Sequence, residues 1–341
     1  MTTKVLITGA GGFMGPHLVA DQLRRGRQVT AVDLKVEGLR PLMAHSRLRV
    51  IQGDFTDRTS LDPCLPDHDI CFHLASAHLE TGVDEAHFWR VNVAGTQDFV
   101  GRCNQAGIGR FVHCSSVGVF GNVTQPPASE TAACHPDIAY EKSKLAGERA
   151  VVEYARETGY SVVVIRPAWV YGPGCPRTLK LFRSIQKGRF FFVGDGRTLR
   201  HPIYVSDMVE GFEGAACHVT APGEVFIMAG PRAVTLRELT AEIARCAGAT
   251  SPRLRLPFAL VWPACYLLEA VGMVLGREVP FSRRSLKFFT DNAAFDTTKA
   301  QEMLGFQAQT ELAAGMARTY AWVQKTDRKG IAGDIVGERL T

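Results

Sequence analysis

Short apolar runs, each followed by a glycine-rich or polar stretch, recur along the first half of the chain and predict buried parallel strands. The first run, Val5–Ile7, is too short for a helix and ends in glycines. Apolar positions with the spacing of one helix face follow at Phe13, Leu18, Val19 and Leu23. This change from a continuous run to a helical period predicts a strand followed by a helix.

The same pattern predicts most of the remaining elements. Strands are expected at 28–33, 48–52, 69–76, 110–116 and 161–166, and helices at about 84–106, 137–158, 208–217, 298–304 and 311–324. Strands that alternate with helices are typical of an α/β fold with a parallel sheet. Pro167 and the prolines up to Pro176 then interrupt regular structure.

Three glycines between the first strand and the first helix indicate a phosphate site. Gly9, Gly12 and Gly15 let the backbone approach a pyrophosphate, and the helix N-terminus adds free N–H groups and a positive dipole end. Pro16 suits the first helical turn. The second strand ends at Asp33, where a dinucleotide fold places a carboxylate for the ribose hydroxyls.

Asp33 also predicts which dinucleotide binds. Its charge would repel a 2′-phosphate, which favours NAD over NADP, whereas Lys35 leaves NADP open. The predicted fold is therefore a Rossmann-type doubly wound parallel sheet with a smaller C-terminal α/β domain. Residues 1–166, with 201–230 rejoining them, would form the dinucleotide-binding domain. Residues 167–200 and 231–326 would form the substrate domain, and 327–341 a loose tail.

Composition narrows the class of protein. The 341 residues carry a net charge of +5, with arginines at 24, 25 and 27 and again at 283 and 284, which fits a solvated surface better than a nucleic-acid face. The nine cysteines form no CxxC pair, and Cys71 and Cys114 lie in apolar strands. We therefore expect a reducing, cytoplasmic compartment, no disulfide scaffold, no metal site and no signal peptide.

Polar residues at the carboxyl ends of later strands are candidates for the same crevice. Asp54 could accept a hydrogen bond from an adenine amino group, or it could form a turn. Asn92 lies in the middle of a predicted helix although asparagine is a poor helix former, so we expect its side chain either to form a specific hydrogen bond or to pack as a polar group against a neighbouring strand. Ser115 and Ser116 end the fifth strand.

Tyr140 and Lys144 lie one helical turn apart and so share a helix face. A phenol that works as a base near neutral pH needs its pKa lowered by roughly three units. A lysine ammonium on the same face favours the phenolate, and a serine hydroxyl can orient a substrate oxygen toward it.

Taken in order, these motifs resemble the extended short-chain dehydrogenase/reductase family, which includes NAD-dependent epimerases, dehydratases and 3β-hydroxysteroid dehydrogenases. The matches are Thr8-Gly9-x-x-Gly12-x-x-Gly15, Asp33, Asp54, His73-Leu-Ala75, Asn92-Val-x-Gly-Thr96, Ser115-Ser116, Tyr140-x-x-x-Lys144 and Arg166-Pro-x-x-Val-Tyr-Gly-Pro173. Phe120 stands where many members carry a tyrosine.

The resemblance implies a set of functional residues. Ser116 would be the catalytic serine, Tyr140 the acid and base, and Lys144 the clamp on the cofactor ribose. The implied cofactor contacts are Gly9, Gly12, Phe13, Met14, Gly15, Asp33, Asp54, Phe55, Leu74, Ala75, Ser76, Asn92, Ser115, Tyr140, Lys144, Pro167 and Val170. Substrate would meet Ser116, Tyr140 and Arg200.

Two features point to different substrates. By resemblance, Arg200 aligns with an arginine that meets the diphosphate of a nucleotide-sugar, and a guanidinium fork suits that group, although a surface arginine is the alternative. The apolar segment 254–275 instead indicates a sterol-like or acyl substrate. We expect it to line an apolar pocket rather than to attach to a membrane.

The preferred function is therefore an NAD-dependent epimerase that oxidises a nucleotide-sugar hydroxyl to a transient ketone. The main alternative is a 3β-hydroxysteroid dehydrogenase-like enzyme or ketoreductase. A dehydratase is disfavoured because Val117 and Gly118 offer no acid/base pair, and a non-catalytic redox sensor is disfavoured by the complete serine, tyrosine and lysine set. The resemblance also implies a homodimer, and a peripheral membrane contact stays open.

Overall fold

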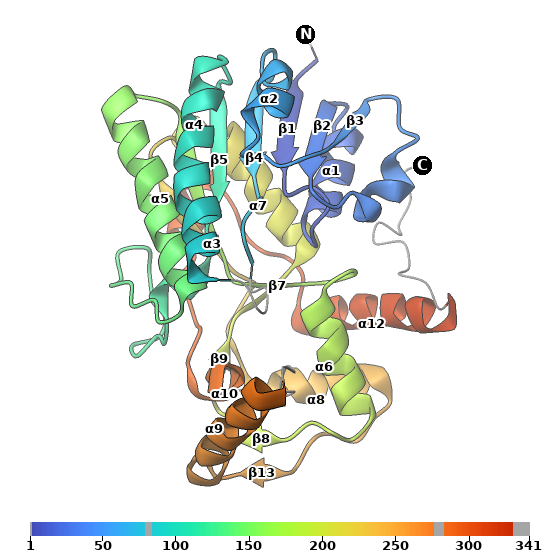
Figure 1. Cartoon of the computed structure of the whole chain (residues 1–341). Helices are drawn as coiled ribbons and strands as arrows, with labels where there is room; N and C mark the ends of the chain where they lie inside the picture. Colours follow the sequence, from blue (N-terminus) through green and yellow to red (C-terminus); the bar gives the residue numbers. More distant parts are fainter. Residues whose placement is uncertain (1, 79–83, 276–282, 330–341) are drawn as a thin grey trace.

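The computed structural model describes residues 2–78, 84–275 and 283–329. Its centre is a seven-stranded sheet whose neighbouring strands are all parallel (Figure 1). In spatial order the strands are β11 (Val225–Met228), β6 (Val162–Pro167), β5 (Arg110–Cys114), β4 (Ile70–His73), β1 (Lys4–Thr8), β2 (Gln28–Asp33) and β3 (Leu48–Gln52). The order reverses between β1 and β4, which confirms the predicted doubly wound α/β fold.

Helices cover both faces of this sheet, so its strands are apolar on both sides. Val5 and Ile7 face one core, whereas Leu6 between them faces the other. The core on the Val5 side, called the first core, contains α1 (Gly15–Arg24), α7 (Val205–Cys217) and α11 (Thr298–Leu304), and the core on the Leu6 side contains α4 (Thr96–Gln105) and α5 (Ala139–Thr158). The uninterrupted apolar runs of the sequence follow from this double burial.

The helix expected at 84–106 has a wide turn in its middle. It consists of α3 (Glu85–Trp89), a π-helical turn at Arg90–Gly95, and α4. A side chain at Gly147 of α5 would come within 2.0 Å of the Asn92 carbonyl oxygen. The π-helical turn and α5 are therefore in close backbone contact, and the sequence period alone did not predict that turn.

A separate hydrophobic core, called the second core, lies beyond the carboxyl ends of the strands, in the lower half of Figure 1. It gathers apolar side chains of α6 (Pro176–Gln186), α8 (Leu236–Ala247) and α12 (Leu312–Lys329). Three short strand pairs complete it: β7 (Trp169–Tyr171) with β10 (Pro202–Tyr204), β8 (Phe192–Val193) with β13 (Arg255–Leu256), and β9 (Leu199–Arg200) with β12 (Val234–Thr235).

Two local predictions in this region are wrong. Helix α12 extends to Lys329, so residues 327–329 are helical, and the rest of the expected tail lies outside the described residues. Helix α7 begins at Val205 instead of the expected residue 208, so Asp207 lies inside its first turn. Its carboxylate accepts hydrogen bonds from the Thr310 amide at 2.8 Å and hydroxyl at 2.9 Å, so it ties the C-terminal segment to α7.

The apolar segment 254–275 also departs from its prediction. It forms β13 and then α9 (Phe258–Leu275), with Pro263 inside the helix. Only Val261 and Cys265 of its described side chains are buried, whereas Leu260 is 67% exposed. Because the large described apolar side chains point to solvent, the helix does not line the expected pocket. Among the described residues, no helix combines the length and apolarity needed to cross a membrane.

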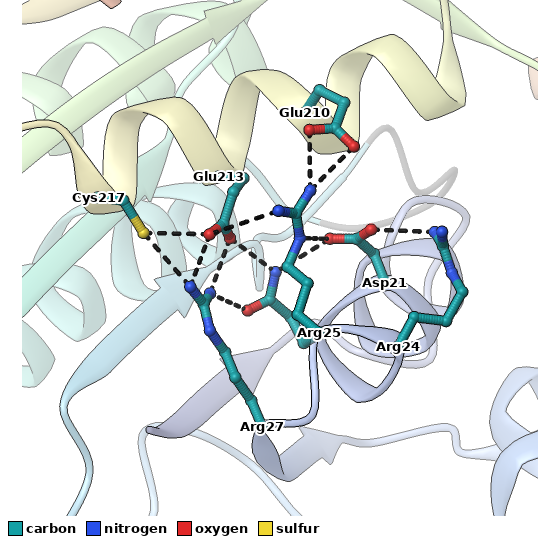
Figure 2. A network of polar contacts seen from close by, with 8 residues as sticks. Asp21, Arg24, Arg25, Arg27, Glu210, Glu213 and Cys217 are labelled. Carbon is teal, nitrogen blue, oxygen red and sulfur yellow. Dashed lines mark hydrogen bonds and ion pairs between the residues drawn. The ribbon is translucent and has the colours of Figure 1, made fainter. Parts of the chain in front are cut away.

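The arginines at the end of α1 and just after it, Arg24, Arg25 and Arg27, form ion pairs within the protein (Figure 2). Arg25 binds Asp21 at 2.7 Å and Glu210 of α7 at 2.8 Å, and Arg27 binds Glu213 of α7 at 2.6 Å. Burial alone would raise the pKa of Glu213, but its hydrogen bonds, Arg27's first among them, hold the pKa below its usual value. These ion pairs therefore join α1 to α7.

Candidate functional site

The glycine loop lies where β1 meets α1, at the point where the strand order reverses. Gly9 has φ +71°, and a side chain there would lie 2.5 Å from the Ala75 amide nitrogen; one at Gly15 would lie 2.3 Å from the Ala10 carbonyl oxygen. Gly12 differs, because it is exposed and its only near neighbour is the Gly9 carbonyl oxygen at 3.4 Å. Packing therefore explains Gly9 and Gly15, whereas Gly12 leaves open space beside the loop.

The same loop has the features of an anion site. Met14 occupies the N-cap of α1 without a side-chain hydrogen bond, and no acidic residue lies in the first turn. The ten-residue helix therefore directs N–H groups and its positive dipole end toward the space at Gly12. A dinucleotide pyrophosphate fits this donor set and this opening.

Asp33 is held against the glycine loop. Its carboxylate accepts from the Gly11 amide at 2.8 Å and from the Lys35 amide at 2.9 Å. A side chain at Gly11 would lie 1.7 Å from the Lys35 carbonyl oxygen, so Gly11 is required for this contact. We did not single out Gly11 from the sequence, although the Gly11-Gly12 doublet marks it.

Three predicted cofactor contacts have internal partners. Asp54 accepts from the Thr56 amide at 2.9 Å and hydroxyl at 2.8 Å, so the turn alternative is correct for that oxygen. The Phe55 ring is buried against His73 at a centroid distance of 4.8 Å, which leaves only its backbone for a ligand. The Asn92 side chain likewise has hydrogen-bond partners within the protein.

The amide of Asn92 makes three hydrogen bonds within the protein. It accepts from the Ala77 amide at 2.8 Å and donates to the Ala77 carbonyl and the Ser143 hydroxyl, each at 3.0 Å. These bonds join the segment after β4 to α5. Asn92 is thus a positioning residue for the Tyr140 helix, and its predicted direct contact with a cofactor is not supported by this geometry.

The remaining predicted cofactor contacts surround the same crevice. Leu74, Ala75 and Ser76 follow β4 and are half-buried, and the Leu74 amide donates to the Thr8 carbonyl at 3.0 Å. Phe13 packs against the second core and Met14 against the first. Pro167 ends β6 opposite Met228, and Val170 touches both cores.

Ser116, Tyr140 and Lys144 meet at the carboxyl end of β5. The Ser116 hydroxyl accepts from the Gly118 amide at 3.0 Å, and the Ser116 side chain acts on the Tyr140 phenol to lower its pKa. Lys144 is buried and donates to the Cys114 carbonyl at 2.6 Å. The structure therefore brings together Tyr140 and Lys144, predicted from their spacing, and Ser116, implied by the resemblance.

Burial dominates the electrostatics of this group. It raises the pKa of the Tyr140 phenol, against the opposing effects of the Arg177 charge and the Ser116 hydrogen bond. Burial likewise lowers the pKa of Lys144. The protein alone thus holds Tyr140 as a neutral phenol, and its use as a base requires further positive charge nearby.

A buried ion pair supports the serine end of the site. Glu148 accepts from the Ser115 hydroxyl at 2.7 Å and pairs with Arg166 at 2.5 Å. The Arg166 guanidinium lies over the Phe120 ring at 4.9 Å. This arrangement fixes Ser115 and gives Phe120 a packing role; Glu148 escaped the sequence analysis because its partners lie on other elements.

The predicted contact of Arg200 with a substrate diphosphate is not supported by this geometry. Arg200 is 6% exposed, and its fork donates to the carbonyl oxygens of Asp291 at 2.5 Å, Lys287 at 3.1 Å and Phe288. Burial lowers the pKa of Arg200 to about 10. It therefore caps the C-terminal end of α10 (Arg283–Thr290) from within.

A second arginine, Arg177, acts electrostatically on the candidate site. It lies in the first turn of α6, is exposed, and its charge acts on both Tyr140 and Arg200. An exposed guanidinium within electrostatic range of the phenol suits an anionic group of a substrate. We did not identify Arg177 from the sequence because only the fold brings α6 toward Tyr140. Among the described residues, no cluster of ligand side chains suits a metal ion.

Comparisons with known proteins agree with this architecture. A model of the NAD dependent epimerase/dehydratase family matches residues 5–229. An N-acetyl-α-D-glucosaminyl-diphospho-ditrans,octacis-undecaprenol 4-epimerase of Escherichia coli O157:H7 is 27% identical over 323 residues, which cover 94% of this chain and 95% of the relative. A 3β-hydroxysteroid dehydrogenase/Δ5→4-isomerase of Mycobacterium tuberculosis is 30% identical over 268 residues, or 74% of this chain and 72% of the relative.

Solved structures give the same picture. MoeE5 in complex with UDP-glucose and NAD superposes with a TM-score of 0.74 at 30% identity, covering 95% of this chain and 99% of that one. The UDP-glucuronic acid 4-epimerase from Bacillus cereus in complex with NAD superposes with a TM-score of 0.78 at 22% identity, with the same coverage. At 22% identity, the similarity to the B. cereus enzyme shows a shared fold only.

Proposed function

The chain belongs to the NAD-dependent epimerase/dehydratase family, and from that premise we propose that it epimerises a sugar carried on a diphosphate, through a transient ketone. The observation that carries this proposal is the meeting of Ser116, Tyr140 and Lys144 beside the glycine loop. The similarity to MoeE5, a structure with UDP-glucose and NAD, supports the sugar substrate.

In the proposed reaction Tyr140 accepts the proton of a sugar hydroxyl, while Ser116 holds that oxygen by a hydrogen bond. NAD, when bound, supplies reversible hydride chemistry at the carbon that bears the hydroxyl. Lys144 would hold the cofactor ribose, and its ammonium together with Arg177 would favour the phenolate over the phenol. Return of the proton by Tyr140, with hydride delivered to the other face of the ketone, gives the epimer.

The glycine loop and Asp33 would hold the cofactor. Gly12 leaves room for the pyrophosphate at the N-terminus of α1, and Asp33 would accept from the ribose hydroxyls. We infer NAD rather than NADP because the Asp33 carboxylate would oppose a 2′-phosphate. The division into a dinucleotide domain and a substrate domain, the homodimer and the cytoplasmic location stay predictions.

The diphosphate is proposed to meet Arg177 rather than Arg200. A sugar diphosphate can end in a nucleoside or in a lipid, as in the undecaprenyl-linked substrate named for the E. coli relative. Both share the anionic group that a guanidinium recognises. The exposed apolar side chains of α9 favour the lipid-linked substrate as a second candidate.

A hydroxysteroid dehydrogenase remains the alternative activity, and relatives of that kind are 30% identical. However, the sequence feature that favoured it was a pocket lined by 254–275. The described large side chains of that segment point outward, so they offer no apolar enclosure for a sterol. The family likeness alone now supports this alternative.

The proposal is tested with purified protein, NAD and a panel of UDP-sugars, by chromatography of the products and the absorbance of NADH. We expect an epimeric sugar without net NADH. Tyr140→Phe should reduce turnover by about a hundredfold or more, because the proton acceptor is lost. Tyr154→Phe is the matched control, since this tyrosine is on the same helix but bonds Asn104.

Stoichiometric NADH formed from a hydroxysteroid, with no sugar turnover, would overturn the epimerase proposal. Full activity of Tyr140→Phe would overturn the proposed chemistry. A Tyr154→Phe variant that loses as much activity as Tyr140→Phe would show that the loss reflects α5 and not the phenol.

A further inference from the structure

Helix α9 exposes an uncharged apolar surface at the end of the molecule farthest from the sheet (Figure 1). Its exposed side chains, together with one residue before the helix, make up what we call the α9 patch: Leu254, Phe258, Leu260, Trp262, Tyr266 and Leu268. From Leu256 to Leu268 the sequence contains no charged residue. A solvated protein surface seldom leaves such a run uncovered, so the patch indicates a contact site.

The patch surrounds the helix instead of forming one narrow stripe. Val261 and Cys265, one turn apart, bind α9 to the second core. Leu260 and Trp262 flank Val261 on the two sides of this buried line, and both are exposed. A protein partner that contacts one face would cover only part of this surface, whereas the interior of a lipid headgroup layer would cover all of it.

The residue types and charges around the patch suit an anionic membrane. The Trp262 and Tyr266 rings pack edge to face at a centroid distance of 4.7 Å, and such amphipathic rings favour the headgroup region of a bilayer. Arg253 and Arg255 are exposed immediately before α9. The loop before β8, the partner of β13, adds exposed Lys187 and Arg189. Basic groups beside apolar ones are complementary to anionic phospholipid.

We propose that the α9 patch docks the protein on the surface of an anionic phospholipid membrane. Helix α9 packs on α10, where Lys287 forms ion pairs with Asp137 at 2.6 Å and with Glu141 at 3.7 Å. Glu141 is the neighbour of Tyr140, so the docked helix lies one element away from the candidate site. On the basis of the proposed function, this favours a sugar whose diphosphate carrier is embedded in that membrane.

Sedimentation with sucrose-loaded vesicles of phosphatidylglycerol and phosphatidylcholine tests the docking without any assay of activity. We expect the full chain to bind the mixed vesicles, and Leu260→Glu to weaken binding by about tenfold. Val219→Glu is the matched control, because Val219 is 83% exposed and follows the segment that contacts Arg110 at the amino end of the central strand β5, whereas α9 lies beyond the carboxyl ends of the strands. This control should bind as tightly as the unchanged chain.

Tryptophan fluorescence gives a second readout. We expect a blue shift on addition of vesicles, and its loss in Trp262→Phe. Arg253→Glu with Arg255→Glu should reduce binding to phosphatidylglycerol vesicles.

Absence of binding to the mixed vesicles, or equal binding by Leu260→Glu, would overturn the proposal. A dimer in light scattering that Leu260→Glu separates, without vesicle binding, would assign the patch to a second copy of the chain. UDP-sugar turnover in solution is measured on the same preparations. Absence of vesicle binding by the unchanged chain, with its turnover retained, would therefore refute the docking and leave the proposed function standing.

Discussion

His73 and His113 are two buried histidines next to the candidate site. They oppose each other on β4 and β5, with ring centroids 5.7 Å apart. His73 has hydroxyl partners in Thr8 at 2.7 Å and Thr96 at 3.3 Å. Within the described part of the chain, neither ring nitrogen of His113 has a hydrogen-bond partner. Both rings are therefore held neutral in a site that would tolerate charge poorly.

These histidines predict acid sensitivity of the fold. Burial, with a smaller effect of Lys144, lowers the pKa of His73 to about 3 and that of His113 in the same direction. Below the unfolded value of about 6.5, the unfolded chain binds protons that the folded one does not. The free energy of unfolding therefore has no penalty from these histidines above that pH, and it declines as the pH falls below it. Between about pH 7.5 and about pH 5.5, we expect the free energy of unfolding, measured by urea unfolding, to fall by about 1.4 kcal/mol per histidine.

His113→Phe isolates one half of this effect. The variant should match or exceed the unchanged chain in stability at about pH 7.5, because it removes an unpaired buried polar ring, and it should lose about half of the pH dependence of the pair. An unchanged pH dependence in His113→Phe would contradict the assignment. A His113→Phe protein that is far less stable at neutral pH would also contradict it.

At the residue scale, the sequence predicted contacts that are local and missed those that are long-range. Tyr140 and Lys144 were found because one helical turn sets their spacing. Arg200 was predicted to meet a diphosphate because its carbonyl partners, up to 91 residues later, cannot be inferred from the residues around it. Asn92 was expected to have a polar partner, but its partners at Ala77 and Ser143 appear only in the fold.

At the element scale, α10 depends on Arg200 for its C-terminal carbonyl groups. Arg200→Met would remove the guanidinium donor from these carbonyl oxygens, of which only that of Lys287 keeps the Asp291 amide at 3.1 Å, so we expect the free energy of unfolding to fall by about 3 kcal/mol. Arg177→Met removes an exposed side chain, so its stability should stay within about 0.5 kcal/mol of the original. The UDP-sugar KM should nevertheless rise by about tenfold or more in Arg177→Met, because a charged contact with the diphosphate is lost.

The two variants are compared by urea unfolding and by steady-state kinetics on the same preparations. A KM unchanged in Arg177→Met but raised in a stable Arg200→Met would return the diphosphate to Arg200. Equal stability of Arg200→Met and the unchanged chain would contradict its capping of α10.

Element predictions succeeded where periodicity decides the outcome. Strands buried on both faces, such as β1 and β5, appear in the sequence as short apolar runs without alternation. The same criterion could not say which way α9 faces, because an apolar helix is equally apolar when it is exposed. The π-helical turn at Arg90–Gly95 was missed for a similar reason, since the close approach of Gly147 that accompanies it comes from another helix.

At the scale of the whole molecule, the segment after α10 joins the sheet-containing part to the second core. The Asn292 side chain accepts from the Leu199 amide at 2.9 Å. Its backbone amide donates to the Asn122 side chain at 2.9 Å, and its carbonyl accepts from the Val123 amide at 3.0 Å. Asn122 and Val123 follow the strand-end serines, so one residue links β9 to the loop beside the candidate site. No motif in the sequence identifies such a junction, because its partners come from two separate segments.

This junction predicts a variant that separates stability from catalysis. Asn292→Ala removes the bond to Leu199 but keeps the backbone bonds, so stability should fall by about 1 to 2 kcal/mol. Asn104→Ala should cost a similar amount, since it removes one side-chain bond to Tyr154 on the far side of α5. Only Asn292→Ala should lower kcat/KM for the sugar, by about tenfold, because a small displacement of β9 and α10 moves the substrate side away from Tyr140. If both variants lose the same kcat/KM at matched stability, the two parts of the molecule do not depend on Asn292 for their alignment.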